Sequence, residues 1–316
     1  MLNKLFKAFR GKDESDIDLS LGYSRLPEFK TLLSQGNYAA FESAYEPLTW
    51  DAKSLLNEGL GLDAANAGLI ETWVQERDDA YIAHLFAGVS KTCLAWIART
   101  AALGSSVSQD KADKYFALLE EAFDHLQRAD DLNPQDAEIC GRMIRVCMGL
   151  QTDTATASSY FDASKKLVPN HLIAHLMMIN YLNPKWQGSL EEMQGFANTM
   201  YTETGSSLLI TLPLFSCVEE WLHYGMNDEK KKKDNFFKDP ALKERIKSMY
   251  AGYREEEDGK LLIPYVYNYF AFLFHMTGER TLAIETARKI TGKMTVYPWA
   301  YIDISSNKEW QATLKF

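Results

Sequence analysis

The sequence predicts an all-α protein whose antiparallel helix pairs stack as a tetratricopeptide-like helical repeat, an α-solenoid. One turn formula appears twice in the same register, once from Ala129 to Pro134 and again from Ala163 to Pro169. The two alanines are 34 residues apart and the two prolines 35. Helix–turn–helix units of this period are typical of tetratricopeptide-type repeats, because one helix pair cannot bury its apolar face alone and stacks on a copy of itself.

Composition predicts the same fold class. The 316 residues include 37 Leu and 32 Ala against 8 Val and 15 Ile. Leu and Ala favour helices, whereas β-branched residues favour strands. The 18 Gly and 9 Pro residues are a small share of the chain, which indicates few turns and long helices.

Helices are predicted where apolar residues are spaced by three and four and a capping residue precedes them. Up to residue 181 these segments are 26–33, 38–48, 52–60, 64–77, 80–102, 108–131, 137–149, 154–167 and 171–181. Ser189 and Glu192 form a capping-box pattern, which predicts the start of a further helix.

Beyond residue 200 the periodicity is weaker. Helices are predicted over 208–224 with a kink at Pro213, over 240–253 behind the N-cap Asp239, over 265–276 after Pro264, and over 281–290. The segment 227–234, with four lysines in a row, predicts a solvated loop and linker. The segment 296–304 is predicted either as a short hairpin strand or as coil.

The turn 183–189 contains Pro184, Trp186, Gly188 and Ser189. Trp186 is predicted to be an apolar wedge that holds the turn, and the alternative is an exposed binding aromatic. Gly188 is predicted to have a positive φ, since it precedes the capping Ser189.

Three parts are expected along the chain: a basic and polar N-terminal segment 1–20, a repeat domain 21–226, and a C-terminal helical extension 227–316 packed on the same solenoid. The first twelve residues carry four positive charges and no negative one. They are predicted to form a frayed or packed leading helix, with attachment to a membrane surface as the alternative. No transmembrane segment is predicted, because the most apolar stretch, 261–276, is too short to cross a bilayer.

The net charge of −9 is concentrated in the front half of the chain. Residues 13–80 hold 14 acids and 4 bases, and residues 111–140 hold 8 acids and 3 bases. This balance disfavours nucleic acid as a ligand and favours a protein partner with a basic surface. The alternative is that the carboxylates only keep the protein soluble. The candidate partner-binding residues are Glu71, Glu76, Asp78, Asp79, Tyr81, Trp96 and Arg99.

Arg99 follows Trp96 by one turn of an apolar helix, so we expect it to be at least half buried. A buried guanidinium needs a carboxylate or carbonyl partner. Arg99 is therefore interpreted either as a tie between helix ends or as an anchor for a carboxylate of a partner.

Motifs for catalysis, metals and cofactors are weak or missing. The sequence has no complete phosphate-binding loop and no Gly-x-Ser-x-Gly elbow, and no cofactor is predicted. His171 and His175 have the spacing of a shared metal ligand pair but no third ligand nearby. Glu121 and His125 form an ordinary pair on one helix face. The four cysteines are expected to be buried thiols, and the cytoplasm is the expected location.

Several of these residues also resemble one family. The order Trp73-Val74, Ala95-Trp96-x-x-Arg99, Leu132-x-Pro134 and Pro184-Lys185-Trp186-Gln187-Gly188-Ser189 is similar to an uncharacterised bacterial tetratricopeptide-like family, domain of unknown function 4034, over about residues 25–200. The signature of that family looks like Pro-Arg-Trp-Gly-Gly-Ser, so Gln187 departs from it, and Thr100 stands where the family usually has Gly. The resemblance implies the fold and carries no activity.

Two function classes follow. The first is a non-catalytic interaction module that binds a protein or peptide in a helical-repeat groove, in one specific form as an immunity or antitoxin-type inhibitor of a basic toxin. The second is an enzyme whose site is assembled from scattered residues such as Tyr81, Arg99, Glu121 and His125.

Overall fold

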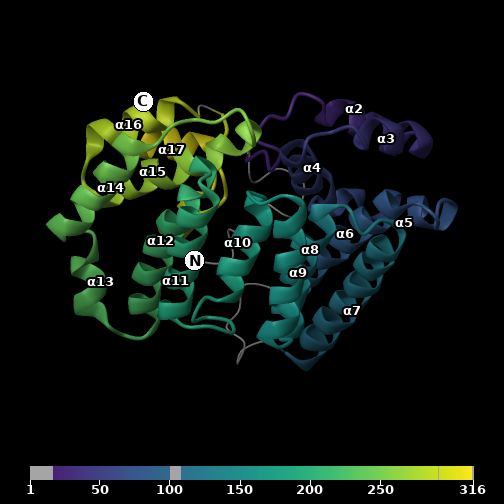
Figure 1. Ribbon diagram of the computed structural model, residues 1–316, viewed down its shortest axis with the longest axis horizontal. Coiled ribbons are helices and arrows are strands. Elements are labelled where there is room, and N and C mark those ends of the chain that lie inside the picture. The colour runs from purple at the N-terminus through teal and green to yellow at the C-terminus, as the bar shows by residue number, and fades with distance from the viewer. Residues whose placement is uncertain (1–16, 100–107, 291, 315–316) are drawn as a thin grey trace.

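The computed structural model describes residues 17–99, 108–290 and 292–314. Within these ranges every regular element is helical, and no strand is present (Figure 1). The prediction of an all-α protein is therefore confirmed.

The N-terminal helices lie across one end of the molecule (Figure 1). They are α2 (Leu26–Ser34), α3 (Tyr38–Tyr45) and α4 (Trp50–Leu56), and α4 runs on into a π-helical turn, Asn57–Gly61. A 3-10 turn, Ala64–Asn66, then leads into α5 (Ala67–Glu76). The π turn fits only because Gly61 has no side chain, since a Cβ there would lie 2.6 Å from Cγ1 of Val89.

The central helices follow one another side by side (Figure 1). They are α6 (Tyr81–Arg99), α7 (Gln109–Leu132), α8 (Ala137–Leu150), α9 (Thr154–Leu167), α10 (Leu172–Tyr181) and α11 (Leu190–Thr204). The helices α6 and α7 approach closely at Gly88, where a Cβ would lie 2.5 Å from Cγ of Leu126. Helix α8 is at the centre, and its residues are buried except for the half-buried Arg145 and Leu150.

One turn geometry occurs three times between these helices. The residue that follows each first helix leaves the helical region, with φ and ψ of −138° and 62° at Arg77, −150° and 86° at Asn133, and −138° and 94° at Val168. In each case its backbone N–H donates to the carbonyl four residues earlier over 2.9 Å. The turn predicted from Pro134 and Pro169 is therefore present, and it also occurs between α5 and α6.

The predicted role of Ala163 is wrong. Ala129 is buried, as the close approach of helices requires, but Ala163 is exposed. Ser164 is the residue equivalent to Ala129. The backbone carbonyl of Ala129 accepts the N–H of Asn133, and the carbonyl of Ser164 accepts the N–H of Val168 in the same way. Ser164 is buried and its hydroxyl donates to the Ala137 carbonyl. Ala129 and Ser164 are 35 residues apart, as are Pro134 and Pro169.

The C-terminal part packs beside α11 and contains only helices in the described ranges (Figure 1). It comprises the 3-10 turn Ser207–Ile210, α12 (Thr211–Met226), α13 (Lys230–Phe236), α14 (Pro240–Gly252), the 3-10 turn Lys260–Leu262, α15 (Ile263–Thr277), α16 (Arg280–Arg288), the 3-10 turn Trp299–Ile302 and α17 (Asn307–Leu314). One hydrophobic cluster contains residues from Ile144 in α8 to Leu314 in α17. The cluster contains residues on both sides of residue 226, the expected boundary of the repeat domain, so the core continues across this position.

The predicted linker is corrected here, and of the two alternatives for 296–304 the hairpin strand is excluded. The lysine run forms helix α13 instead of a linker, since Nζ of Lys233 lies 5.0 Å from the ring centre of Trp221 and Nζ of Lys232 lies 5.1 Å from that of Tyr224. The long lysine stems therefore cover aromatic surface on α12. Pro213 lies in the first turn of α12, where a missing N–H costs nothing. The segment 296–304 includes a 3-10 turn and no strand.

Candidate functional site

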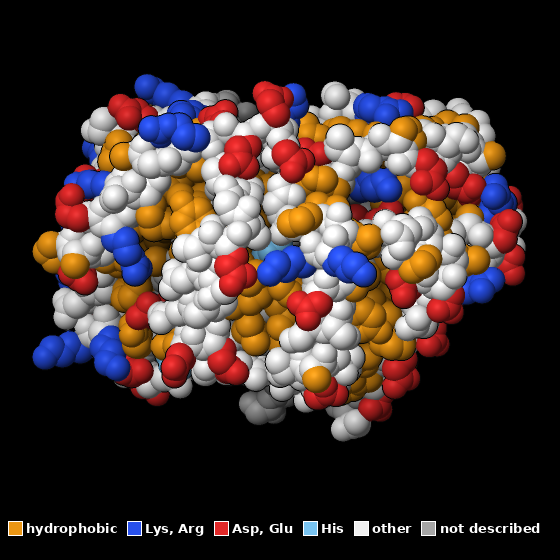
Figure 2. All heavy atoms as spheres, viewed as in Figure 1, with side chains coloured by type: hydrophobic (Ala, Val, Ile, Leu, Met, Phe, Trp, Pro, Cys, Tyr) orange, Lys and Arg blue, Asp and Glu red, His pale blue; other side chains and the backbone are white. Residues whose placement is uncertain are grey.

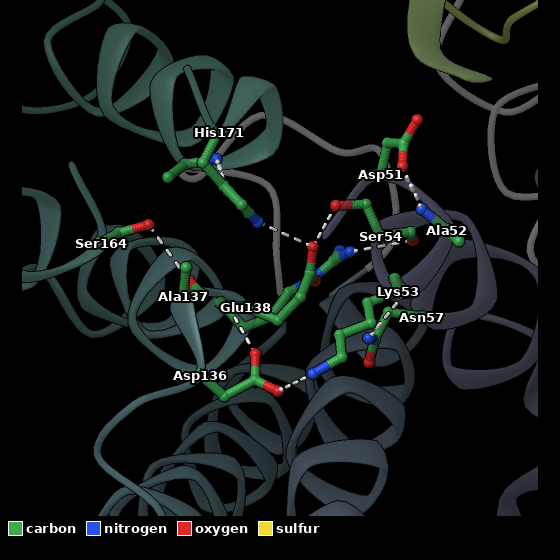
Figure 3. Close-up of polar contacts among 12 residues, drawn as sticks. Asp51, Ala52, Lys53, Ser54, Asn57, Asp136, Ala137, Glu138, Ser164 and His171 are labelled. Atoms are coloured by element: carbon green, nitrogen blue, oxygen red, sulfur yellow. Dashed lines mark hydrogen bonds and ion pairs between the residues drawn. The ribbon is translucent and has the colours of Figure 1, made fainter. Parts of the chain in front are cut away.

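A buried polar network joins α4 to the starts of α8 and α10 (Figure 3). The carboxylate of Glu138 accepts hydrogen bonds from the Ser54 hydroxyl and from Nε of Arg142, the latter at 3.0 Å. Nε2 of His171 lies 3.0 Å from the same carboxylate. Nη1 of Arg142 donates to Glu58 in the π turn at 2.5 Å. These contacts connect residues 84 positions apart in the sequence.

The electrostatics of this network favour the charged forms. Burial by itself would raise the pKa of Glu138, but Arg142, His171 and Ser54 outweigh it and hold that pKa at about 2. Burial would lower the pKa of Arg142, and the carboxylates of Glu138 and Glu58 raise it. Glu138 is thus a poor proton acceptor, and Ser54 donates to it and not to a histidine. We interpret this group as a structural connection between helices, because it is closed to solvent and lacks a nucleophile–base pair.

His171 and His175, expected as surface or half-buried histidines with metal binding as the alternative, are both fully buried and have separate structural roles. Nδ1 of His171 accepts a hydrogen bond from the N–H of Ala174 at 3.1 Å, so this ring caps α10. Nδ1 of His175 lies 2.9 Å from the His171 carbonyl, and its ring packs edge-on against Phe161. In the described ranges no three His, Cys, Asp or Glu side chains are grouped to hold a metal ion.

The other face of α4 contacts the C-terminal part. Nε1 of Trp50 donates to Asp258 at 3.0 Å, and a carboxylate oxygen of Asp51 accepts the N–H of Leu261 at 3.1 Å. Asn170, in the turn before α10, also donates to Asp258. Helix α4 therefore contacts two segments that are distant from it in the sequence, the α8–α10 region and residues 258–261.

A second group of interest, which we call the Arg99 cluster, consists of Trp96, Arg99, Tyr115, Arg145 and Trp186. Cζ of Arg99 lies 5.6 Å from the ring centre of Trp96, 5.9 Å from that of Tyr115 and 5.7 Å from that of Trp186. Cζ of Arg145 lies 5.9 Å from the Trp96 ring centre. The two tryptophan rings meet edge to face with centres 5.4 Å apart. The structure thus brings Trp186 of the turn 183–189 to Trp96 and Arg99, which are neighbours on one helix.

The four acidic candidates lie elsewhere, on α5 and the turn that follows it. Figure 2 shows acidic side chains gathered along the edge formed by α5 and α7. The exposed acids of these elements are Glu71, Glu76, Asp78, Asp79, Asp110, Asp113, Glu120, Glu121, Asp124 and Asp131. Asp79 is partly neutralised, since Nε of Arg77 lies 3.3 Å from its carboxylate.

A pocket of about 180 Å³ lies within this acidic edge, between α5 and α7. Its floor is α6, with Ala87, Ser90, Lys91 and Leu94, and its walls include Ala67, Ile70, Glu71, Val74 and Gln75 of α5 and His125 of α7. Nζ of Lys91 is bound to Glu121 at 2.6 Å. We call this pocket and its exposed acidic rim the acidic trough.

The residues suggested for a catalytic alternative do not assemble into one site. Tyr81 begins α6 and Arg99 ends it, which separates their backbones by about 27 Å at 1.5 Å per residue. The Tyr81 hydroxyl faces Asp136 at 3.5 Å, and burial raises its pKa. Arg99 lies with the aromatic rings described above, so these residues belong to different surfaces.

His125 pairs with His84, which was not among the candidates from the sequence. Nδ1 of His125 lies 3.1 Å from Nδ1 of His84, and Nε2 of His84 lies 3.0 Å from the Asp78 carbonyl. Burial lowers the pKa of His84, and burial together with the neighbouring His84 lowers that of His125. One neutral ring therefore donates to the other, and the pair ties the α5–α6 turn to α7.

The turn 183–189 keeps its shape through a close backbone approach. A Cβ at Gly188 would lie 2.1 Å from the Leu182 carbonyl oxygen, and φ of Gly188 is not positive, so the predicted reason for this glycine is wrong. Ser189 caps α11 as predicted, since its hydroxyl accepts the Glu192 N–H at 3.2 Å. Pro184 and Trp186 are half buried.

Arg145, Tyr115 and the α8 network were missed from the sequence. The signal was present in α8, an apolar helix in which Glu138, Arg142 and Arg145 are spaced by four and three and so share one face. Charges on one face of a buried helix indicate buried partners, but the partners Ser54 and Glu58 follow only from the fold.

One described helix, α6, is long and apolar enough to cross a membrane. In the structure 67% of that stretch is buried within the protein, where α6 packs between α5 and α7.

Comparison of the chain with protein-family models, curated proteins and solved structures finds no match. The family resemblance therefore stays a prediction.

Proposed function

We propose that this protein is a non-catalytic interaction module of tetratricopeptide-like architecture, and that its acidic trough binds a basic segment of a protein partner. The repeat architecture is supported by the turn geometry shared by Arg77, Asn133 and Val168. The observation that carries the binding proposal is the position of the pocket, which opens in the acidic edge beside Glu71.

The trough fits an amphipathic basic helix better than a uniformly charged segment. Its floor and walls are largely apolar, with Ala87, Leu94, Ile70 and Val74, so an aliphatic side chain of the partner fills it favourably. The exposed carboxylates around it pair with Lys or Arg on the flanks of that helix. Leu69 on α5 and Phe116 on α7 are two of the three large hydrophobic side chains exposed in the described part of the chain.

In this proposal the exposed carboxylates raise the association rate constant of the partner. Like charges along one edge steer an oppositely charged partner, and the effect is screened over about 8 Å at physiological ionic strength. When the partner is a basic toxin enzyme, the protein would act as an immunity or antitoxin-type inhibitor by covering the basic surface of that enzyme.

Charge reversal with a matched control tests the proposal. The trough variant carries Glu71→Lys, Glu76→Lys and Asp78→Lys, and the control variant carries Asp162→Lys, Asp234→Lys and Glu285→Lys, which are exposed acids outside the trough. Both change the net charge equally. The probe is a synthetic amphipathic helix of Lys and Leu, and surface plasmon resonance measures its association with the full chain.

We expect the trough variant to lower the association rate constant about tenfold or more at low salt, and the control to change it far less. Thermal unfolding should be nearly unchanged in both. Equal slowing in the two variants, or an association rate that depends on neither salt nor trough charge, would show that these carboxylates serve solubility only.

A further inference from the structure

The Arg99 cluster holds two positive charges that have no counter-ion among the described residues. Neither guanidinium has a carboxylate within ion-pair distance there, whereas Arg142 on the same helix as Arg145 is paired with Glu138 and Glu58. Arg99 and Arg145 are half buried and lie over the same indole ring of Trp96. Their charges are compensated among the described residues only by aromatic rings, and an anion would compensate two partly desolvated guanidinium groups more fully.

Arg99 and Arg145 both act electrostatically on the hydroxyl group of Tyr115. Burial raises the pKa of the Tyr115 hydroxyl, while Arg99 and Arg145 both act to lower it. Glu219, whose charge acts together with that of Arg145 on the Tyr297 hydroxyl, is bound to Lys185 at 2.8 Å and to the Tyr301 hydroxyl at 2.6 Å.

Two further donors in the cluster are unused. The indole N–H groups of Trp96 and Trp186 are buried and have no hydrogen-bond acceptor. A buried donor without an acceptor costs stability, so such groups in native proteins call for an explanation. Both rings belong to the cluster and lie beside Arg99.

We propose that the Arg99 cluster is a binding site for a phosphate monoester dianion. A phosphoryl group carries a charge of about −2 and three acceptor oxygens, which matches two guanidinium groups and additional N–H donors. A carboxylate offers one charge and two oxygens and would leave one guanidinium uncompensated. The planar forks of arginine suit phosphoryl oxygens in a way that lysine does not.

This site is separate from the acidic trough. None of the cluster residues lines the pocket, whose floor on α6 ends at Leu94, five residues or about 8 Å along the helix before Arg99. Asp78 and Asp79 lie at the other end of α6, about 27 Å from Arg99. Because the two surfaces carry opposite charge, they bind different chemical groups. An anion bound at Arg99 and a basic segment bound at the trough can be present together.

Titration with defined probes tests the proposal. Phenyl phosphate and inorganic phosphate are titrated into the full chain by calorimetry, with phenol and acetate as controls for the ring and for a single negative charge. A peptide containing phosphotyrosine distinguishes a phosphorylated partner from a small molecule. The variants are Arg99→Gln and Arg145→Gln, and Arg128→Gln on exposed α7 is the matched control.

We expect one molecule of phenyl phosphate to bind per chain, about tenfold or more weakly in Arg99→Gln and in Arg145→Gln, and unchanged in Arg128→Gln. Tighter binding of the phosphopeptide than of phenyl phosphate would assign the group to a partner, and equal affinity would assign it to a small molecule. The melting temperature of the two cluster variants should change little, because each removes contacts with aromatic rings and also a like-charge repulsion.

The proposal is overturned if the folded parent binds neither phosphate probe, or if acetate binds as tightly as phosphate. It is also overturned if the cluster variants retain the affinity of the parent. A marked loss of melting temperature in Arg99→Gln together with unchanged affinity would show that the cluster only holds the helices together.

Discussion

Nη1 of Arg142 on α8 lies 2.5 Å from a carboxylate oxygen of Glu58 in the π turn after α4. The same guanidinium bonds Glu138 one turn earlier on its own helix. Through Arg142 the N-terminal helices are therefore attached to the centre of the protein by charge as well as by packing.

Removing Glu138 should destabilise the protein strongly. In Glu138→Ala the buried Arg142 loses one carboxylate and the Ser54 hydroxyl loses its acceptor. Breaking a buried ion pair by removing one partner costs about 3–5 kcal/mol, measured by urea denaturation. Ser54→Ala, which removes one neutral donor, should cost about 1 kcal/mol. Equal costs for the two variants would contradict the assigned charge pairing.

Acid should remove the contribution of Glu138. Its pKa in the folded protein is about 2, below its ordinary value of 4.5. A carboxyl with a lowered pKa stabilises the folded state above its unfolded pKa and loses this contribution as the pH falls toward the folded value. The stability difference between the parent and Glu138→Gln should therefore shrink as the pH falls from 4.5 to 2, as measured by denaturation at each pH. A constant difference would show that Glu138 is not charged in the folded state.

His175 should make the protein less stable in mild acid. Burial lowers its pKa from 6.5 to about 4, so below pH 6.5 the unfolded chain binds a proton that the folded chain refuses. Stability is then lost as the pH falls from 6.5 toward 4, by about 3 kcal/mol at about 1.4 kcal/mol per pKa unit. His175→Gln should flatten this part of the stability profile. His223→Gln, which removes an imidazole from α12, should leave it in place.

Gly188→Ala and Gly195→Ala should have opposite effects. A Cβ at Gly188 would lie 2.1 Å from the Leu182 carbonyl oxygen, so the turn must shift to admit it. Gly195 lies inside α11 with nothing within 4 Å of the added atom, and alanine there should stabilise the helix by about 0.5–1 kcal/mol. Thermal unfolding checks both. A Gly188→Ala variant as stable as the parent would show that the turn is tolerant.

The elements predicted well from the sequence are those decided by local chemistry. Pro134 and Pro169 end a helix because proline lacks an N–H and restricts φ, and the caps Ser189 and Asp239 satisfy N–H groups within their own first turns. Leu and Ala content decided the helical class for the same reason, since helix propensity belongs to each residue.

Other features were decided only by the tertiary structure, because they depend on partners remote in the sequence. The lysine run became helix α13 when its stems met Trp221 and Tyr224 on α12. Ser164 replaced Ala163 as the packed residue because one position of shift moves a side chain about 100° around a helix. Arg99 and Arg145, 46 positions apart in the chain, acquired a common neighbour in Trp96 only when α6 packed near α8. For most of the helices, helix propensity and capping residues specified the position along the chain. The pairing of buried charges depends on distances between residues remote in the sequence, and only the packed fold defines those distances.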